Sequence, residues 1–141
     1  MTRFLSLLVL GLTLSSSALA DEEGAETCVR TKVWDGYADG WGIRTLTSTT
    51  LAPNATRNYL VTLYKGNEYQ ITTCGDEGVQ NLDVLLYDLN GNVVLRDDTA
   101  DREPKLYFQP TETSTYYIVL HARELKTGAT GAGVSMAVVY R

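Results

Sequence analysis

Apolar and polar side chains alternate in short segments from residue 46 to the end of the chain. A period of two over about four to eight residues is typical of β-strands, because successive side chains of a strand point to opposite faces. Glycine, proline and asparagine residues separate the segments, and Asn90-Gly91 is a strong signal for a two-residue hairpin turn. The pattern predicts strands at residues 46–51, 59–64, 69–73, 82–87, 93–95, 105–109, 115–122 and 134–140.

Short strands separated by turn residues, without a long helical segment, predict an all-β fold. We expect an antiparallel, jelly-roll-like β-sandwich of about eight strands at residues 44–141, with no linker that divides it. Within it, residues 59–64 and 69–73 should form a hairpin through Lys65-Gly66-Asn67. Asn90-Gly91 should close a second hairpin.

The segment before the strands has a different period. Its large apolar residues recur at spacings of three and four, as on one face of a helix. Gly36, Gly40 and Gly42 weaken a helix there, each by up to about 1 kcal/mol relative to alanine. We therefore expect residues 21–43 to comprise an acidic leader at residues 21–26 and then a short helical segment. The apolar residues that carry this prediction are Val33, Trp34, Tyr37 and Trp41.

Trp34, Tyr37 and Trp41 allow two interpretations. Flat aromatic faces stack on sugar rings, so the three side chains could form a ligand platform. The same spacing is what a helix needs to pack on a sheet. We favour packing, which predicts that the three rings are mostly buried.

The first twenty residues have the three parts of a secretory signal peptide. Arg3 is followed by an apolar run at residues 4–14 and by small residues that end in Ala18-Leu19-Ala20. The run is shorter than the roughly 20 residues that span a bilayer as a helix. We expect cleavage between Ala20 and Asp21, and a secreted or periplasmic protein that does not insert into a membrane afterwards.

The charge balance argues against nucleic acid as a partner. The formal net charge is −5, and cleavage after Ala20 removes Arg3 but no acidic residue, which gives −6. Nucleic acids and anionic membranes are bound by clustered Lys and Arg, whereas the basic residues here are scattered.

Cys28 and Cys74 are the two cysteines of the chain. An even pair in an exported protein predicts one disulfide. A metal pair or a redox couple is the competing interpretation, but neither a C-x-x-C spacing nor a nearby histidine supports it.

The order of motifs in the strand region resembles the bacterial pre-peptidase C-terminal domain. The resemblance rests on residues 59–71, the run 81–88 (NLDVLLYD), the Asn90-Gly91-Asn92 turn, and residues 104–108 and 115–119. It implies a β-sandwich that accompanies secreted enzymes as a non-catalytic module. Two features depart from the family: residues 1–141 contain no peptidase domain beside the match, and Ser114-Thr115 stands where the family often has a glycine.

Candidate catalytic chemistry is confined to His121, the single histidine. A catalytic histidine needs a partner that tunes it and a reacting group beside it. His121 lies in a predicted strand, and we expect it to be structural rather than a general base or a metal ligand. No nucleophile-elbow, zinc-protease or phosphate-binding motif is present.

Carboxylates are the richest polar feature and raise the question of calcium. Calcium takes about six to eight oxygen ligands, which acidic loops at the end of a sandwich can supply. Asp88-x-Asn90-x-Asn92 imitates the start of a calcium loop but is better explained as a hairpin turn. We expect solvated loops and no cofactor, with calcium as the alternative. The candidate ligands are Asp76, Glu77, Asp97, Asp98 and Asp101.

These observations predict an exported, non-catalytic binding or accessory module. Its partner would be an extracellular or periplasmic protein or a polysaccharide. The alternative is a secreted enzyme or enzyme inhibitor with a polar cleft around His121, onto which at least two carboxylates would converge.

Overall fold

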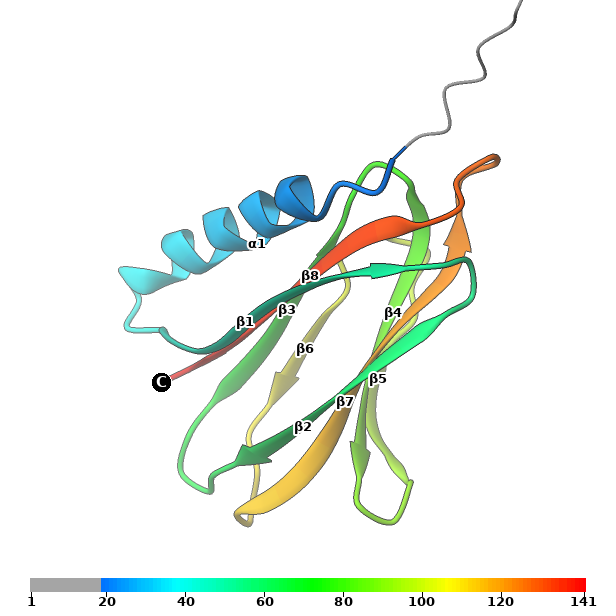
Figure 1. Cartoon of the computed structure of the whole chain (residues 1–141). Coiled ribbons are helices and arrows are strands. Elements are labelled where there is room, and N and C mark those ends of the chain that lie inside the picture. Colours follow the sequence, from blue (N-terminus) through cyan, green and yellow to red (C-terminus); the bar gives the residue numbers. More distant parts are fainter. Residues whose placement is uncertain (1–18) are drawn as a thin grey trace, which may run out of the picture.

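The computed structural model describes residues 19–141, which form one helix and eight strands (Figure 1). The predicted signal peptide lies outside the described residues except for Leu19 and Ala20. In the described part of the chain, no helix is both long and apolar enough to cross a membrane. The elements are α1 (Glu22–Tyr37), β1 (Gly42–Leu51), β2 (Thr56–Leu63), β3 (Tyr69–Gly75), β4 (Val79–Asp88), β5 (Val93–Asp97), β6 (Lys105–Phe108), β7 (Ser114–Leu125) and β8 (Ala132–Tyr140).

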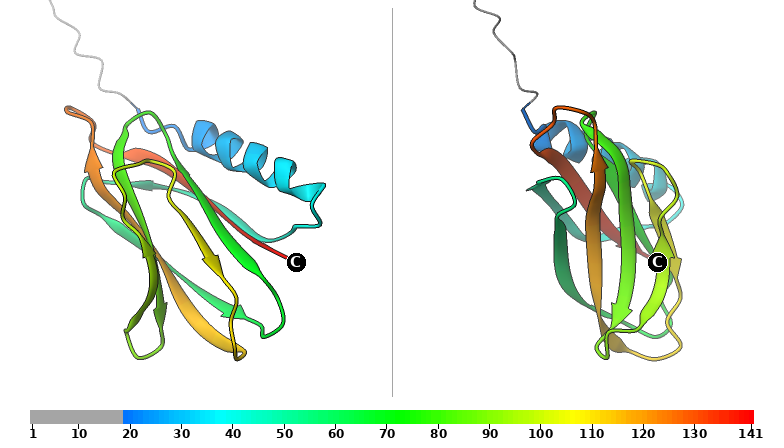
Figure 2. Two further views of the ribbon diagram at one scale, coloured as in Figure 1. Left: turned by 180° about the vertical axis from the view of Figure 1, so that it is seen from behind. Right: turned by 90° about the vertical axis from the view of Figure 1, so that its right-hand side faces the viewer.

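The strands form two antiparallel four-stranded sheets with the order β1-β8-β3-β6 and β2-β7-β4-β5. This alternation of strands between two facing sheets is the jelly-roll arrangement, so the predicted fold class is confirmed. Figure 2 shows the two layers from behind and from the side. The core between them is apolar and includes Leu63, Ile71, Leu86, Ile118 and Met136.

One of the two expected hairpins is wrong. β2 pairs with β7, and β3 pairs with β8 and β6, so the Lys65-Gly66-Asn67 turn carries the chain from one sheet to the other. The physical reason is that Leu63 and Ile71 both enter the core, and they do so from opposite sheets. A short turn of this kind can join two strands of one hairpin or two strands of different sheets.

The Asn90-Gly91 hairpin is confirmed, because β4 and β5 pair across it. Gly91 has φ of 81°, a conformation that favours glycine. Asp88 Oδ1 accepts hydrogen bonds from the backbone N–H groups of Asn90 and Asn92, both at 2.9 Å. These bonds, chiefly the one from Asn92, hold the pKa of Asp88 below its ordinary value. The Asp88-x-Asn90-x-Asn92 sequence therefore serves the turn.

Helix α1 lies across the outer face of the β1-β8-β3 part of one sheet (Figure 1). Val29 of the helix packs with Ala137 and Val139 of β8. Eight consecutive residues of β8 are buried, because the core covers one face of this strand and the helix covers the other. The predicted disulfide joins Cys28 of α1 to Cys74 of β3, with Cα atoms 6.1 Å apart, and so fastens the helix to the sheet.

The helix begins earlier than expected, and the acidic segment at residues 21–26 is not a leader but its first turns. Asp21 is the N-cap, and its Oδ1 accepts a hydrogen bond of 2.8 Å from the backbone N–H of Gly24. Glu22 and Glu23 follow in the first turn, where negative charge is favourable. The helix ends at Tyr37, so that Trp41 lies beyond it.

Candidate functional site

An exposed aromatic surface lies along the second half of α1. Trp34 is 77% exposed and Tyr37 is 69% exposed, so the expected burial of these two rings is wrong. Trp41 is buried, as expected, at 9% exposure. The helix packs on the sheet through smaller residues, among them Ala25 and Val29, which leaves Trp34 and Tyr37 on its flank.

The two exposed rings run parallel, with centroids 6.2 Å apart and planes inclined by 9°. Beside them β1 contributes Ile43, which is 53% exposed, and the half-buried Leu46. Together these side chains line an apolar groove of about 250 Å³ between the helix and the first strand. We call this surface the α1–β1 patch; it consists of Arg30, Val33, Trp34, Tyr37, Ile43 and Leu46.

Arg30 is the single charged residue of the patch. Its guanidinium group is held by Glu26 one helical turn earlier, at 2.6 and 2.8 Å. Sequence reasoning found Trp34 and Tyr37 but missed Ile43, because residue 43 was placed at the end of the helical segment. Its position beside the helix depends on how β1 pairs with β8.

Trp41 lines a different depression and is separated from the other two aromatic residues. Arg141 lies over its ring, 4.6 Å from the centroid. The depression, about 510 Å³, is more polar than the α1–β1 patch. Its other lining residues are Asp39, Glu68, Tyr69, Gln70, Tyr107, Phe108, Gln109 and Arg141. The three rings of the alternative, platform interpretation are therefore split between two surfaces.

His121 lies in a polar network on β7. Its Nε2 is 2.8 Å from Oδ1 of Asn54, and its Nδ1 is 3.5 Å from Oδ2 of Asp83. Asp83 is also bound by Arg123, whose Nε lies 3.0 Å away. Within residues 19–141, Asp83 is the one carboxylate that pairs with His121, whereas the enzyme hypothesis required at least two. The network is consistent with a structural role.

The candidate calcium ligands are used in separate local contacts. Asp97 accepts backbone hydrogen bonds from Thr99 and Lys105. Partial burial acts to raise the pKa of Asp97, but these bonds and the one from the Thr99 hydroxyl outweigh it and leave the pKa lowered. Asp101 accepts backbone bonds from Arg102 and Glu103.

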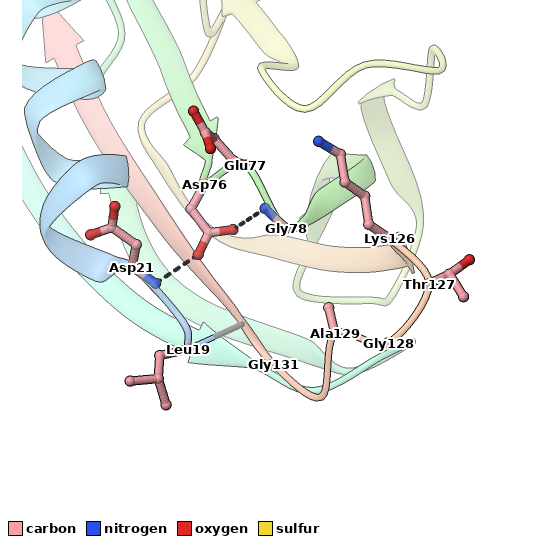
Figure 3. Close-up of a pocket in the computed structure, with 10 residues that line it drawn as sticks. All are labelled: Leu19, Asp21, Asp76, Glu77, Gly78, Lys126, Thr127, Gly128, Ala129 and Gly131. Atoms are coloured by element: carbon pink, nitrogen blue, oxygen red, sulfur yellow. Dashed lines mark hydrogen bonds between the residues drawn. The ribbon is translucent and has the colours of Figure 1, made fainter. Parts of the chain in front are cut away.

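Asp76 is buried and accepts hydrogen bonds from three backbone N–H groups, two of which, those of Asp21 and Gly78, are drawn in Figure 3. Glu77 follows it at the edge of the pocket drawn in the same view. Among the residues that the structure describes, the one group of three potential metal ligands within 4.8 Å of one another is Cys28, Cys74 and Glu103. Two of its members form the disulfide, and Glu103 is paired with Lys32 at 2.9 Å. The structure does not gather the five candidate carboxylates into such a group.

We expect no calcium-specific stabilisation. Melting temperatures in millimolar calcium and in equal magnesium should agree within about 1 °C, because both ions only screen an acidic surface. A site saturated about a hundredfold above its dissociation constant would add about 2.7 kcal/mol, or roughly ten degrees. A calcium-only rise of that size, lost in Asp98→Ala, would contradict this expectation.

Two solved structures share the fold of this chain. The crystal structure of PliG from Aeromonas hydrophila, a periplasmic inhibitor of g-type lysozyme, aligns with a TM-score of 0.51 at 13% identity, over 69% of this chain and 85% of its own. The pre-peptidase C-terminal domain of collagenase from Bacillus anthracis aligns with a TM-score of 0.52 at 14% identity, over 69% and 90%. No protein family and no curated protein matches the sequence. The resemblance to the pre-peptidase C-terminal domain is thus confirmed as one of fold.

Proposed function

We propose that this chain is an exported, non-catalytic module that binds another exported protein through the α1–β1 patch. The observation that carries the proposal is the exposure of Trp34, Tyr37 and Ile43 around one apolar groove. Exposed apolar clusters on soluble domains mark interaction sites. Trp, Tyr and Arg are the residues most enriched where binding energy concentrates in protein interfaces.

A protein partner suits this groove better than a polysaccharide. Sugar hydroxyl groups need several hydrogen-bonding side chains around the aromatic ring, whereas the surface of the groove is mostly apolar and Arg30 is its one charged residue. Its guanidinium group is already paired with Glu26. An apolar segment of another protein, by contrast, needs no such partners.

Polysaccharide binding is the second candidate, at the depression around Trp41. There, aromatic rings stand beside amide and carboxylate side chains, among them Gln70, Gln109 and Glu68. Retention of the protein on an insoluble polysaccharide, abolished by Tyr107→Ala but not by Trp34→Ala, would favour this candidate. Tyr107 is 62% exposed.

Two further observations support an exported accessory role. The Cys28–Cys74 disulfide is typical of proteins in oxidising compartments. One structural neighbour is described as periplasmic and as an inhibitor of an enzyme, and the other as a domain of one. An inhibitor would itself be a protein-binding module, so the same patch is where we expect it to act.

The proposal is tested by affinity capture with matched variants. The mature protein is immobilised, and proteins from the envelope and medium of its own host are passed over it. We expect one protein to be retained by the wild type and by Tyr107→Ala, whose replaced ring lies on the other surface. The Trp34→Ala/Tyr37→Ala variant should bind it at least about thirtyfold more weakly, since loss of two hot-spot residues costs 2 kcal/mol or more.

One result of the capture experiment would contradict the proposal. If the double variant retains the same proteins with the same affinity as the wild type, the α1–β1 patch is not the binding surface. Circular dichroism and melting curves of both variants serve as the folding control, and we expect both to match the wild type.

A further inference from the structure

Asp76 is a buried carboxylate in the turn between β3 and β4, with 7% of its surface exposed. Its Oδ2 accepts two hydrogen bonds of 2.7 Å, from the backbone nitrogens of Asp21 and Gly133. Its Oδ1 accepts one of 2.8 Å from the nitrogen of Gly78. Figure 3 shows the side chain between the start of α1 and its own turn, with the bonds to Asp21 and Gly78 drawn.

The nitrogen of Asp21 is the atom that cleavage of the signal peptide would release. Hydrolysis of the bond between Ala20 and Asp21 adds the oxygen of water to the carbonyl carbon of Ala20. The Asp21 nitrogen keeps its hydrogen and gains two protons, because an α-amino group is protonated at neutral pH. A neutral N–H that now lies 2.7 Å from Asp76 would become a positively charged ammonium group at the same place.

We propose that the fold contains a site for its own new N-terminus: Asp76 binds the α-ammonium group of Asp21 once the bond after Ala20 is cut. The buried carboxylate then acquires a full counter-charge. Charge-assisted hydrogen bonds of this kind are roughly twice as strong as bonds to a neutral N–H. The uncleaved precursor, which has an amide at this position, lacks the ion pair.

The surroundings fit this role. A Cβ on Gly133 would lie within 2.4–2.5 Å of the backbone of Asp21 and Glu22, so only glycine lets the start of the helix approach β8 this closely. Leu19 is exposed, which leaves the bond after Ala20 accessible from outside. A pocket of about 530 Å³ adjoins Asp21 and Asp76 (Figure 3) and is lined partly by Leu19, which cleavage removes.

Asp76 also offsets the positive charge at the start of the helix. A positive charge at the N-terminus of a helix is unfavourable, because the helix dipole already places partial positive charge there. The side chain of Asp21 is engaged with Gly24 as the N-cap. Asp76, together with Glu22 and Glu23 in the first turn, supplies the negative charge that such a terminus needs.

The experiment compares two N-termini of otherwise identical proteins. One is exported and processed, and its first residue is established by mass spectrometry; the other keeps Gly-Ser before Asp21. We expect the first chain to begin at Asp21 and to melt several degrees higher than the extended chain. The matched control is the same two proteins with Asp76→Asn, whose melting temperatures should agree within about 1 °C.

Reactivity of the α-amino group gives a second readout that does not depend on the variant. At pH 7 an amine-specific reagent should label Asp21 of the native processed protein at least tenfold more slowly than Asp21 of the unfolded protein. A mature chain that begins at another residue would overturn the proposal. So would equal melting temperatures of the two wild-type N-termini, an extension effect that persists in Asp76→Asn, or labelling of native Asp21 at the unfolded rate.

Discussion

Replacing both Cys28 and Cys74 by alanine should lower the melting temperature by roughly 15 °C. The disulfide closes a loop with a sequence separation of 46 residues. A loop of this length restricts the unfolded chain enough to stabilise the native state by about 4 kcal/mol in the chain-entropy model. In a domain of this size, 1 kcal/mol corresponds to roughly 4 °C.

The loss should be larger than for an ordinary surface link, because this disulfide also fastens α1 over β8 and β3. Without it, the helix is held by Val29 and its apolar neighbours and by polar contacts such as those between Asp21 and Asp76 and between Lys32 and Glu103. Cys28→Ala as a single variant, which leaves a free thiol at Cys74, should melt close to the double variant. Calorimetry measures both, and a decrease of less than about 3 °C would show that the packing of α1 suffices without the link.

Trp41→Ala should destabilise the fold by about 3–5 kcal/mol, whereas Trp34→Ala should change the free energy of unfolding by no more than about 0.5 kcal/mol. The two substitutions delete the same atoms seven positions apart in the sequence. Trp41 packs in the cluster between α1 and the sheet and is covered by Arg141, so its removal leaves a cavity. Trp34 is 77% exposed, and alanine is a better helix former at this position.

Urea unfolding of the two variants measures this difference. Equal destabilisation by both would mean that the ring of Trp34 packs on the domain in solution, which would remove the basis of the α1–β1 patch. Stability of Trp41→Ala equal to that of the wild type would mean that the second apolar cluster contributes little to holding the helix.

The strands could be predicted from the sequence because a period of two is imposed locally by the geometry of each strand. The partner of each strand could not. The turn at Lys65-Gly66-Asn67 suits a hairpin, yet Leu63 and Ile71 face each other across the core from different sheets. This choice depends on the packing of the whole sandwich.

The aromatic residues show where periodicity misleads. Trp34, Tyr37 and Trp41 have helical spacing, but the helix ends at Tyr37, and its buried face is made of smaller residues such as Ala25 and Val29. The large aromatic side chains therefore do not mark the buried face of the helix. Gly40, with φ of 86°, is the local signal for the end of the helix, and the spacing of the three aromatic residues extends past it.

The hydrogen-bond partners of Asp76 could not be predicted from the sequence either. Its carboxylate was grouped with nearby acids as a candidate calcium ligand, whereas two of its three backbone partners lie 55 and 57 residues away in the chain. Such contacts follow from tertiary structure alone. The disulfide could be predicted because the chain has two cysteines, so that each can pair only with the other.

Binding of another exported protein at the α1–β1 patch can be detected by site-specific photo-crosslinking in cells that export this chain. A photoreactive phenylalanine analogue replaces Tyr37, Ile43 or Tyr107 in separate variants. We expect a discrete crosslinked product with the same protein from positions 37 and 43, and no such product from position 107. A product from position 107 together with none from positions 37 and 43 would contradict it.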